Sequence, residues 1–406
     1  MTQLDEAQPD EARSAPGPLA GVKVVDLSVM ISGPLAGMML ADQGADVVKV
    51  ESPGLGDLMR WLGTSKGGMT GIFANNNRGK RSLVVDLKKP EGLDVVRRLV
   101  ADADVLIQNF RPGALERLGL GYDAMSVLNP DLVYVSISGY GPDGPNSHRR
   151  VYDNVIQAAS AIASVQTDPA TGAPTMLRTL VCDKVTAYTA AQAITAALYA
   201  RAMGTARGQH VVVSMLDAAI AFMWPDSGMD AVFLDDDVAH LPTIGQNYAV
   251  TQLADGYMSA GAVSDAEFRG LCAALGRAEI PEDVRFADPA SRTRHLPELV
   301  SELRKSAARV TVAEFERAAE EHDVPASKIV TLDQLPSEPQ VIHNKVFVER
   351  RHPAAGVLRE PRPAPRFSST PASVASPAPM FGEHSDAIVR ELGLDPDALR
   401  SAQVIA

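Results

Sequence analysis

Apolar runs of strand length alternate with helical stretches through the first half of the chain. Buried strands are predicted at residues 22–27, 46–51, 81–87, 104–110 and 131–138. Helices are predicted between them, from the spacing of the apolar residues, at 33–44, at 90–103 and around 112–128. This alternation predicts a mostly parallel, doubly wound sheet. Ligands of such sheets bind at the carboxyl ends of the strands.

The pattern changes after residue 224. An acidic, irregular segment is followed by a predicted strand at 255–263, a helix at 265–276 and further short helices across 280–328. This order predicts a smaller α+β domain. The segment 352–380 is rich in proline, and a helix is predicted after it at 384–392, so we interpret the segment as an extended arm over the surface.

The chain of 406 residues is long enough for two domains. We expect four parts, in chain order: a disordered tail over 1–17, a large Rossmann-like α/β domain over 18–224, a small α+β domain over 225–340, and a C-terminal arm and helix over 341–406 that return to the large domain.

Charge and cysteine content narrow the class of protein. The net charge is −12 and the pI is near 5.2, which argues against nucleic-acid and acidic membrane partners. Cys182 and Cys272 are the only cysteines, so we expect no disulfide framework and a cytoplasmic location. Neither a signal-peptide pattern at the N-terminus nor an apolar run of membrane-spanning length is seen, so we expect no membrane partner.

Several common cofactor motifs do not occur. The first strand-to-helix turn is SVMISGP, which lacks the G-x-G-x-x-G of dinucleotide sites. No G-x-x-x-x-G-K-[ST] loop and no zinc-ligand spacing is found either. We therefore expect no metal and no tightly bound cofactor.

Three turns carry candidate ligand-binding residues. Residues 77–82, NRGKRS, combine three cations with amide and hydroxyl donors, a set that suits a phosphate. Residues 109–113 follow a predicted strand, with Arg117 one turn further on, and residues 152–154 follow Arg150. Each also has a structural interpretation: a solvated basic turn, a strand-to-helix turn and a helix cap, respectively.

Asp183 stands where a loop is predicted to enter a helix, and TARGQHVVVSMLD continues that helix into a turn and a strand. A carboxylate at this place can be an N-cap, which stabilises a helix by about 1 kcal/mol. It can equally be a nucleophile, because the helix dipole favours the ionised form and no separate base is needed. Spacing alone leaves both interpretations open.

The chain resembles the class III, or CaiB/BaiF-type, CoA-transferases, a family that includes formyl-CoA:oxalate CoA-transferase, carnitine CoA-transferase and α-methylacyl-CoA racemase. The resemblance covers roughly residues 18–395 and rests on ordered motifs: LAGVKVVDL, SGPLAGMMLADQGADVVKVESPGLGD, NNNRGKRSLVVDLKKPEG, DVLIQNFRPGALERLGLGYD, LNPDLVYVSISGYG, the Asp183 helix with RGQHVVVSMLDA, and GEHSDAIVRELG. It implies a large and a small domain in an interlocked homodimer.

The resemblance also implies roles for individual residues. Asp183 falls at the catalytic aspartate. The residues expected at the CoA site are Asn77, Lys80, Arg81, Asn109, Phe110, Ala114, Arg117, Arg150 and Tyr152. The residues expected at the substrate pocket are Val29, Ile31, Asp153 and Gly245. Val29 and Ile31 replace a histidine and a glutamine of the formyl-CoA enzyme, which favours a more apolar acid.

The implied activity is transfer of CoA from an acyl-CoA donor to a carboxylic acid acceptor through a covalent aspartyl-CoA thioester on Asp183. Acyl-CoA is then a substrate rather than a bound cofactor. Two alternatives stay open: an acyl-CoA racemase or epimerase of the same fold, and a non-catalytic CoA-binding protein. A racemase needs an acid/base pair at the α-carbon, and Tyr152 stands where that branch has a histidine, which favours transfer.

Overall fold

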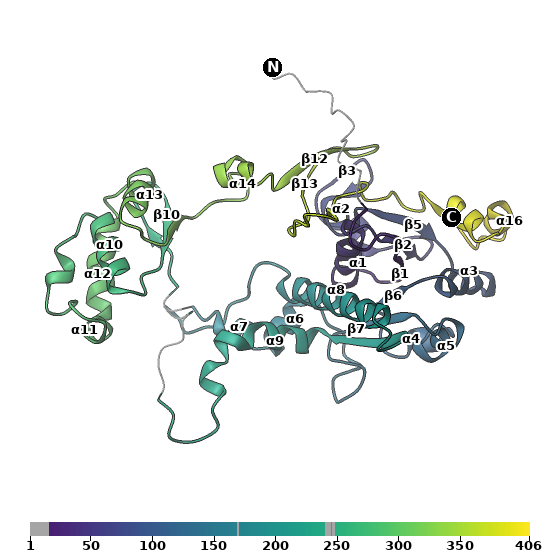
Figure 1. Cartoon of the computed structure of the whole chain (residues 1–406), viewed down its shortest axis with the longest axis horizontal. Coiled ribbons are helices and arrows are strands. Elements are labelled where there is room, and N and C mark those ends of the chain that lie inside the picture. The colour runs from purple at the N-terminus through teal and green to yellow at the C-terminus, as the bar shows by residue number, and fades with distance from the viewer. Residues whose placement is uncertain (1–15, 169, 240–244, 246–247) are drawn as a thin grey trace, which may run out of the picture. The chain divides into compact units, whose positions relative to one another are not determined.

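The computed structural model describes residues 16–168, 170–239, 245 and 248–406. Most of the predicted N-terminal tail, residues 1–15, lies outside the described residues. The chain forms two compact units: one is Pro225–His343, and the other joins the residues up to Trp224 with Asn344–Ala406. Figure 1 shows the order of the elements along the chain.

Six parallel strands form the central sheet of the first unit, in the order β5-β2-β1-β6-β7-β8. The strands are β1 (Lys23–Asp26), β2 (Asp46–Glu51), β5 (Lys80–Val84), β6 (Val105–Gln108), β7 (Val133–Ser138) and β8 (Gln209–Ser214). This sheet confirms the predicted parallel α/β architecture.

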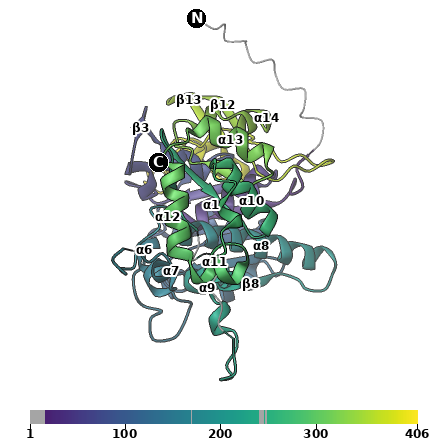
Figure 2. The ribbon, with the colours of Figure 1, turned by 90° about the vertical axis from the view of Figure 1, so that its left-hand side faces the viewer.

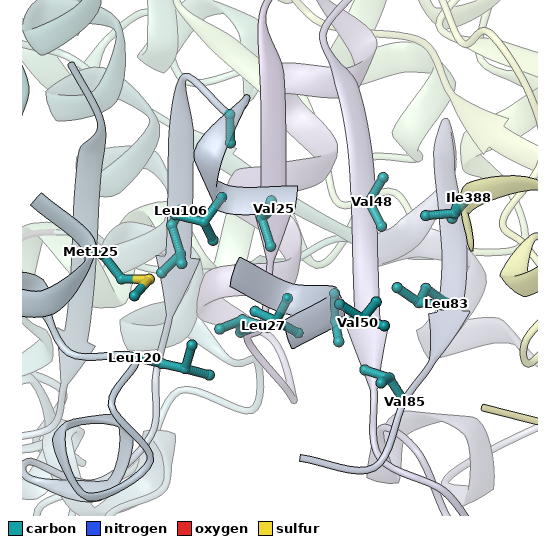
Figure 3. Packing of buried hydrophobic residues seen from close by; sticks show 14 of the residues in the cluster. Val25, Leu27, Val48, Val50, Leu83, Val85, Leu106, Leu120, Met125 and Ile388 are labelled. Carbon is teal, nitrogen blue, oxygen red and sulfur yellow. The ribbon is translucent and has the colours of Figure 1, made fainter. Parts of the chain in front are cut away.

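Helices cover both faces of the sheet, which explains why its strands are apolar runs rather than alternating patterns. Helices α1 (Ser32–Asp42) and α8 (Val181–Ala202) pack on the face that carries Val24. The opposite face carries Val25, and Figure 3 shows its core. The helices on that face are α3 (Pro90–Ala101), α4 (Ala114–Arg117), α5 (Tyr122–Leu128) and α15 (Ser385–Glu391).

The strand order reverses between β1 and β6. The chain leaves β1 toward α1 on one face and leaves β6 toward α4 on the other. In open α/β sheets such a reversal separates two loops and opens a crevice at the carboxyl ends of the strands. The loop 28–31 and the segment 109–113 therefore flank the expected ligand position.

The remaining elements of the first unit surround this sheet. Most are short: 3₁₀-helix η1 (Leu58–Trp61), β3 (Ser65–Lys66), β4 (Met69–Thr70), α2 (Gly71–Asn77), α6 (Asp153–Ala159), α7 (Ile162–Val165), α9 (Met215–Ser227) and α16 (Pro396–Ser401). The C-terminal segment bonds to the sheet edge, where the N–H of Asp86 donates to the carbonyl of Val404 over 2.8 Å.

The arm predicted over 352–380 begins with a hairpin that the sequence pattern did not indicate. Strands β12 (Phe347–His352) and β13 (Gly356–Pro361) pair in antiparallel register. The imidazole Nδ1 of His352 accepts the N–H groups of Ala354 and Ala355 over 3.1 and 3.0 Å, and Gly356 has φ +80°. A side chain that closes the turn thus replaces the usual turn dipeptide, which is why composition missed it.

In the second unit, helices accompany a three-stranded sheet, and Figure 2 shows its helices α10, α11, α12 and α13. The strands are β9 (Thr251–Gln252), β10 (Tyr257–Ala260) and β11 (Ala326–Lys328), in the order β11-β10-β9. The helices are α10 (Asp265–Ala274), α11 (Pro289–Arg294), α12 (Leu296–Ala307) and α13 (Val312–Glu321), with α14 (Pro339–His343) at the end of the unit.

No helix in the described part of the chain has both the length and the apolar character that a membrane crossing requires.

Candidate active site

The loop 28–31 between β1 and α1 lies at the carboxyl end of β1, where the ligand of such a sheet is expected. The amide of Asn109, at the end of β6, grips this loop at both polar groups of one residue: the Val29 N–H donates to Asn109 Oδ1 over 2.9 Å, and Asn109 Nδ2 donates to the Val29 carbonyl over 2.7 Å. The next residue, Met30, has φ +69°, a left-handed conformation that is unusual for a side-chain-bearing residue. The loop 28–31 and the segment that begins at Asn109 are therefore tied together.

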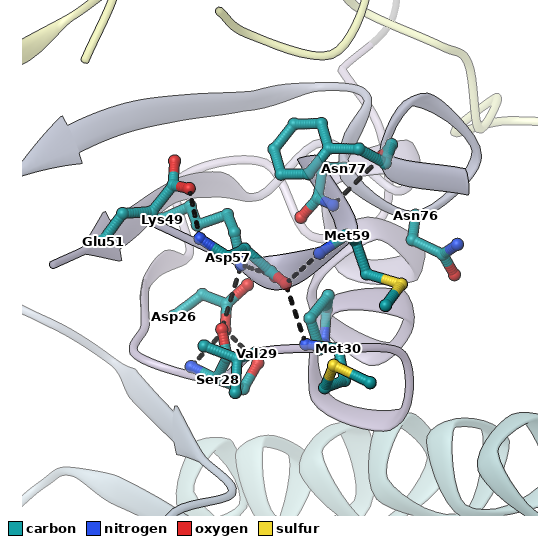
Figure 4. A network of polar contacts seen from close by, with 12 residues as sticks. Asp26, Ser28, Val29, Met30, Lys49, Glu51, Asp57, Met59, Asn76 and Asn77 are labelled. Carbon is teal, nitrogen blue, oxygen red and sulfur yellow. Dashed lines mark hydrogen bonds and ion pairs between the residues drawn. The ribbon is translucent and has the colours of Figure 1, made fainter. Parts of the chain in front are cut away.

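A buried ion pair holds the same loop from behind (Figure 4). Lys49 Nζ lies 2.9 Å from Asp57 Oδ2, and both side chains are fully buried. Lys49 donates to the Ser28 carbonyl over 2.9 Å, and Asp57 Oδ1 accepts the Met30 N–H over 3.1 Å. Each of the two charged side chains binds the backbone of the loop as well as the other side chain. These buried contacts hold the backbone of residues 28–30 in one conformation.

The charge of Lys49 persists in this buried site. Burial alone lowers its pKa, but the carboxylates of Asp26, Asp57 and Glu51 outweigh burial and raise the pKa above its ordinary value. The ammonium therefore stays protonated at neutral pH and keeps its donors on the loop.

The structure corrects the interpretation of residues 77–82 as a phosphate-binding or solvated turn. Lys80 is buried, and its Nζ donates to Asp26 Oδ2 over 2.8 Å, to Asn77 Oδ1 over 2.8 Å and to the Pro34 carbonyl over 2.7 Å. These three acceptors use all hydrogens of the ammonium. Asn77 is buried too, and burial lowers the pKa of Lys80 to about 8, against the opposing charge of Asp26. Both side chains are therefore buried and hydrogen-bonded inside the protein.

Arg81 is half-buried at the sheet edge. Its guanidinium makes paired bonds to Asp46, at 3.0 and 2.7 Å, and to Glu391 of α15, at 2.9 and 2.8 Å. These bonds join the C-terminal helix to the sheet, so in this structure Arg81 serves the fold.

Asp183 is the third residue of α8, and Leu180 is the N-cap. The N-cap interpretation of Asp183 is therefore wrong. Its side chain points to the start of α1, where Ser32 Oγ donates to Asp183 Oδ1 over 2.7 Å. Small residues on α8, among them Ala187 and Ala190, pack with α1 in one core and let the two helix starts approach. The carboxylate thus lies at the N-terminal ends of two helices, where the helix dipoles favour its ionised form.

Asp153 supplies the cap that Asp183 does not. It is the first residue of α6 and is buried, and its Oδ2 accepts the N–H of Asp183 over 2.9 Å. Gln157 donates to its other oxygen over 2.6 Å. Asp153 therefore acts on the backbone of α8, at the residue that carries the candidate nucleophile.

The environment of Asp183 favours the neutral acid more than water does. Burial raises its pKa to about 6, and the charge of Asp153 adds to the rise, while hydrogen bonds from the side chain and backbone of Ser32 oppose it. A carboxylate with a pKa near 6 is mostly ionised at neutral pH and is more basic, and hence more nucleophilic, than an ordinary one.

The other predicted residues divide by exposure. Phe110 and Ala114 are half-buried beside Asn109, whereas Arg117, Arg150 and Tyr152 are exposed. These five side chains are accessible to a ligand to different degrees.

The predicted pocket residues do not all face one site. Val29 is half-buried in the loop that Asn109 holds. Ile31 is buried in a core with Met59 and Phe73, which corrects its assignment to the pocket. Gly245 is exposed and belongs to the second unit.

Sequence reasoning missed Ser32, Lys49 and Asp57. A signal for Lys49 exists, because a lysine in the middle of an apolar parallel strand must find a buried partner. The signal for Ser32 is weaker: it opens the helix after the first strand, where ligands of doubly wound sheets bind.

Comparison with known proteins identifies the family of the chain. Residues 19–385 match the sequence model of CoA-transferase family III. The chain is 36% identical to succinate–glutarate CoA-transferase of Agrobacterium fabrum over 92% of this chain and 96% of that protein. It is 32% identical to human succinyl-CoA:glutarate CoA-transferase over 92% of this chain and 86% of that protein. A solved CaiB/BaiF family protein from Brucella suis is 31% identical and superposes with a TM-score of 0.82 over 93% of this chain and 100% of that one.

Proposed function

Since the chain belongs to CoA-transferase family III, we propose that it moves CoA between two carboxylic acids through a covalent thioester on Asp183. Its relatives are CoA-transferases, and this chain is an enzyme of the same type. The observation that carries the covalent proposal is the carboxylate of Asp183, which lies in the first turn of α8 and accepts a hydrogen bond from Ser32 at the start of α1.

The first half of the reaction loads the enzyme. An Asp183 oxygen attacks the thioester carbon of the donor acyl-CoA, the carbon–sulfur bond breaks, and CoA leaves as a thiolate. The product is a mixed anhydride between Asp183 and the acyl group. The thiolate then attacks the γ-carbon of Asp183, the anhydride bond breaks, the donor acid leaves as its carboxylate, and Asp183 holds CoA as a thioester.

The second half repeats these steps in reverse with the acceptor acid. Its carboxylate attacks the γ-carbon of Asp183 and releases the thiolate, which attacks the acceptor's carbonyl and frees Asp183. One thioester is consumed and one is formed, so no proton or electron pair is left over. The chain must hold the carboxylate ionised, exclude water and offer donors to the developing oxyanions.

For the acids we propose small dicarboxylates of the succinate–glutarate size. The names of two relatives specify succinate and glutarate. The case for a more apolar acid weakens, since Ile31 belongs to the core and leaves Val29 alone at the loop.

We further propose the CoA contacts and the assembly that the family resemblance implies. Asn109, Phe110, Ala114 and Arg117 would line the CoA site, with Arg150 and Tyr152 near it. Asp153 would keep its place beside Asp183, and Gly245 would shield the intermediate. The two units would act as large and small domains of an interlocked homodimer in the cytoplasm.

Trapping of the covalent enzyme tests the proposal. The protein is incubated with succinyl-CoA, quenched with hydroxylamine, and the modified peptide is identified by mass spectrometry. We expect a hydroxamate on Asp183 in the wild-type protein. In Asp183→Ala and Asp183→Asn we expect neither the hydroxamate nor turnover. Asp123→Asn, which alters an exposed carboxylate on α5, is the matched control and should behave as wild type.

Other outcomes would reject the covalent role. Substantial turnover in either Asp183 variant would exclude it directly. Exchange of the α-proton for solvent deuterium without an acceptor acid would indicate a racemase. Binding of CoA with no labelled peptide across a panel of acyl-CoAs would indicate a binding protein.

A further inference from the structure

Ser32 contacts the carboxylate of the candidate nucleophile, Asp183. It is the first residue of α1, its side chain is buried, and its Oγ donates to Asp183 Oδ1 over 2.7 Å. A serine hydroxyl has a single hydrogen, so that hydrogen is committed to Asp183. The two residues are 151 positions apart in the sequence.

The position of Ser32 is fixed by the contacts of the loop that precedes it. It directly follows the loop that Asn109 grips at Val29 and that the Lys49–Asp57 pair holds from behind. Gly33 comes next, and a Cβ there would lie 2.3 Å from the side chain of Ser28, so only glycine lets the loop close this tightly. The hydroxyl therefore meets Asp183 from a fixed direction.

We propose that Ser32 is a catalytic residue of the transfer reaction, in which its hydroxyl binds Oδ1 of Asp183, leaves Oδ2 as the attacking oxygen, and donates to the oxyanion that forms on Oδ1. This inference rests on the proposed covalent function of Asp183.

The steps of the reaction put negative charge on the oxygen that the Ser32 hydroxyl contacts. Once Oδ2 has attacked the thioester, Oδ2 bridges to the acyl group and Oδ1 is the carbonyl oxygen of the anhydride. Attack of the CoA thiolate on the γ-carbon forms the carbon–sulfur bond and pushes an electron pair onto Oδ1. When that pair returns, the bond to Oδ2 breaks and the donor acid leaves with Oδ2. The Ser32 hydroxyl already faces Oδ1 at the start, so it needs no rearrangement to stabilise this charge.

A backbone donor accompanies the hydroxyl. A hydrogen bond from the backbone of Ser32 also lowers the pKa of Asp183, beside the larger effect of its side chain. The N–H of Ser32 lies in the first turn of α1, has no partner within the helix, and is the group that makes this contact. Side chain and backbone of one residue thus form a two-donor oxyanion site.

The test compares Ser32→Ala and Ser32→Cys with wild type, using succinyl-CoA as donor and glutarate as acceptor. A thiol is a weaker donor than a hydroxyl, so the series is graded. We expect kcat to fall about 100- to 1,000-fold in Ser32→Ala, the usual cost of removing one oxyanion donor, and to fall less in Ser32→Cys. The KM for succinyl-CoA should hardly change.

The pH profile separates a catalytic role from a structural one. Ser32 lowers the pKa of Asp183, so its loss should move the acidic limb of kcat/KM to higher pH. Ser385→Ala is the matched control, because Ser385 is also a buried first residue of a helix and its hydroxyl accepts one bond, from the Val84 N–H. That variant should lower the melting temperature without moving the limb.

The possible outcomes distinguish the role of Ser32 from the covalent mechanism. A hydroxamate on Asp183 in wild type, with kcat and the acidic limb unchanged in Ser32→Ala, would overturn the role of Ser32 and leave the covalent mechanism intact. Absence of the hydroxamate in active wild-type enzyme would overturn the covalent mechanism, and the Ser32 proposal with it. A KM effect and a lower melting temperature alone would assign Ser32 to the fold.

Discussion

Replacement of Asp183 by asparagine should abolish transfer and at the same time stabilise the ligand-free protein at neutral pH. Asparagine has nearly the same shape, and its carbonyl oxygen can still accept the Ser32 hydroxyl. What it removes is a carboxylate whose ionisation is unfavourable in its half-buried place. The ionised carboxylate that the reaction needs therefore lowers the stability of the folded protein.

The magnitude follows from the pKa. Burial raises the pKa of Asp183 from 3.8 to about 6, a shift of about 2 units at about 1.4 kcal/mol each. A raised pKa means that the folded state holds the proton longer than the unfolded chain, so this carboxyl lowers stability as pH rises from 3.8 through about 6. The cost is about 3 kcal/mol at pH 7.5 and about 1 kcal/mol at pH 4.5.

The asparagine variant avoids this cost, and the pKa of about 6 already includes the hydrogen bonds from Ser32. We expect a gain of about 3 kcal/mol at pH 7.5 and about 1 kcal/mol at pH 4.5. In thermal unfolding this is a rise of roughly 4 °C at pH 7.5.

Melting temperatures of wild type, Asp183→Asn and Asp123→Asn, measured without CoA at several pH values, test the reasoning. The exposed Asp123 serves as the control and should show no comparable pH dependence. A difference between wild type and Asp183→Asn that is the same at pH 4.5 and pH 7.5 would refute the calculation. So would an asparagine variant that is less stable at pH 7.5.

Two further predictions concern the support of the loop 28–31. Lys49→Met should lower the free energy of unfolding by about 3–5 kcal/mol, because it leaves Asp57 buried without its partner; Lys23→Met, which breaks only an exposed pair with Asp102, should cost about 1 kcal/mol or less in the same urea titration. Equal costs for the two lysines would contradict the role of burial. Gly33→Ala should lower both kcat and stability, by roughly 1–3 kcal/mol for the overpacked loop, since the new Cβ would meet Ser28 at 2.3 Å. Gly71→Ala, whose Cβ has no neighbour closer than 3.8 Å, should be tolerated, and a tolerated Gly33→Ala would disprove the close packing.

Much of the framework could be predicted from local pattern. The apolar runs at β1, β2 and β6 indicate strands because a parallel strand covered on both faces has no polar alternation. Asp183 was placed at a helix start by the change from loop to helical spacing, and the structure puts it in the first turn of α8. The ordered motifs also identified the family, which the match over residues 19–385 confirms.

The prediction failed where a residue's partner lies far away in the sequence. A turn with three cations is typical of a phosphate site, yet Lys80 is buried against Asp26 and Arg81 is paired with Glu391. Nothing local to residues 77–82 reports those acidic partners, because they come from β1 and from the C-terminal helix.

The sequence by itself therefore determined the strands and helices, the direction of the sheet and the family, since each depends on spacing within a segment or on the order of segments. Only the tertiary structure decided which polar groups are paired inside the protein and which are available for the reaction. Ser32 and Asp183 meet because α1 and α8 pack closely through small residues, and Lys49 meets Asp57 inside the core. Such pairings depend on how elements pack in space, which the periodicity of one element does not encode.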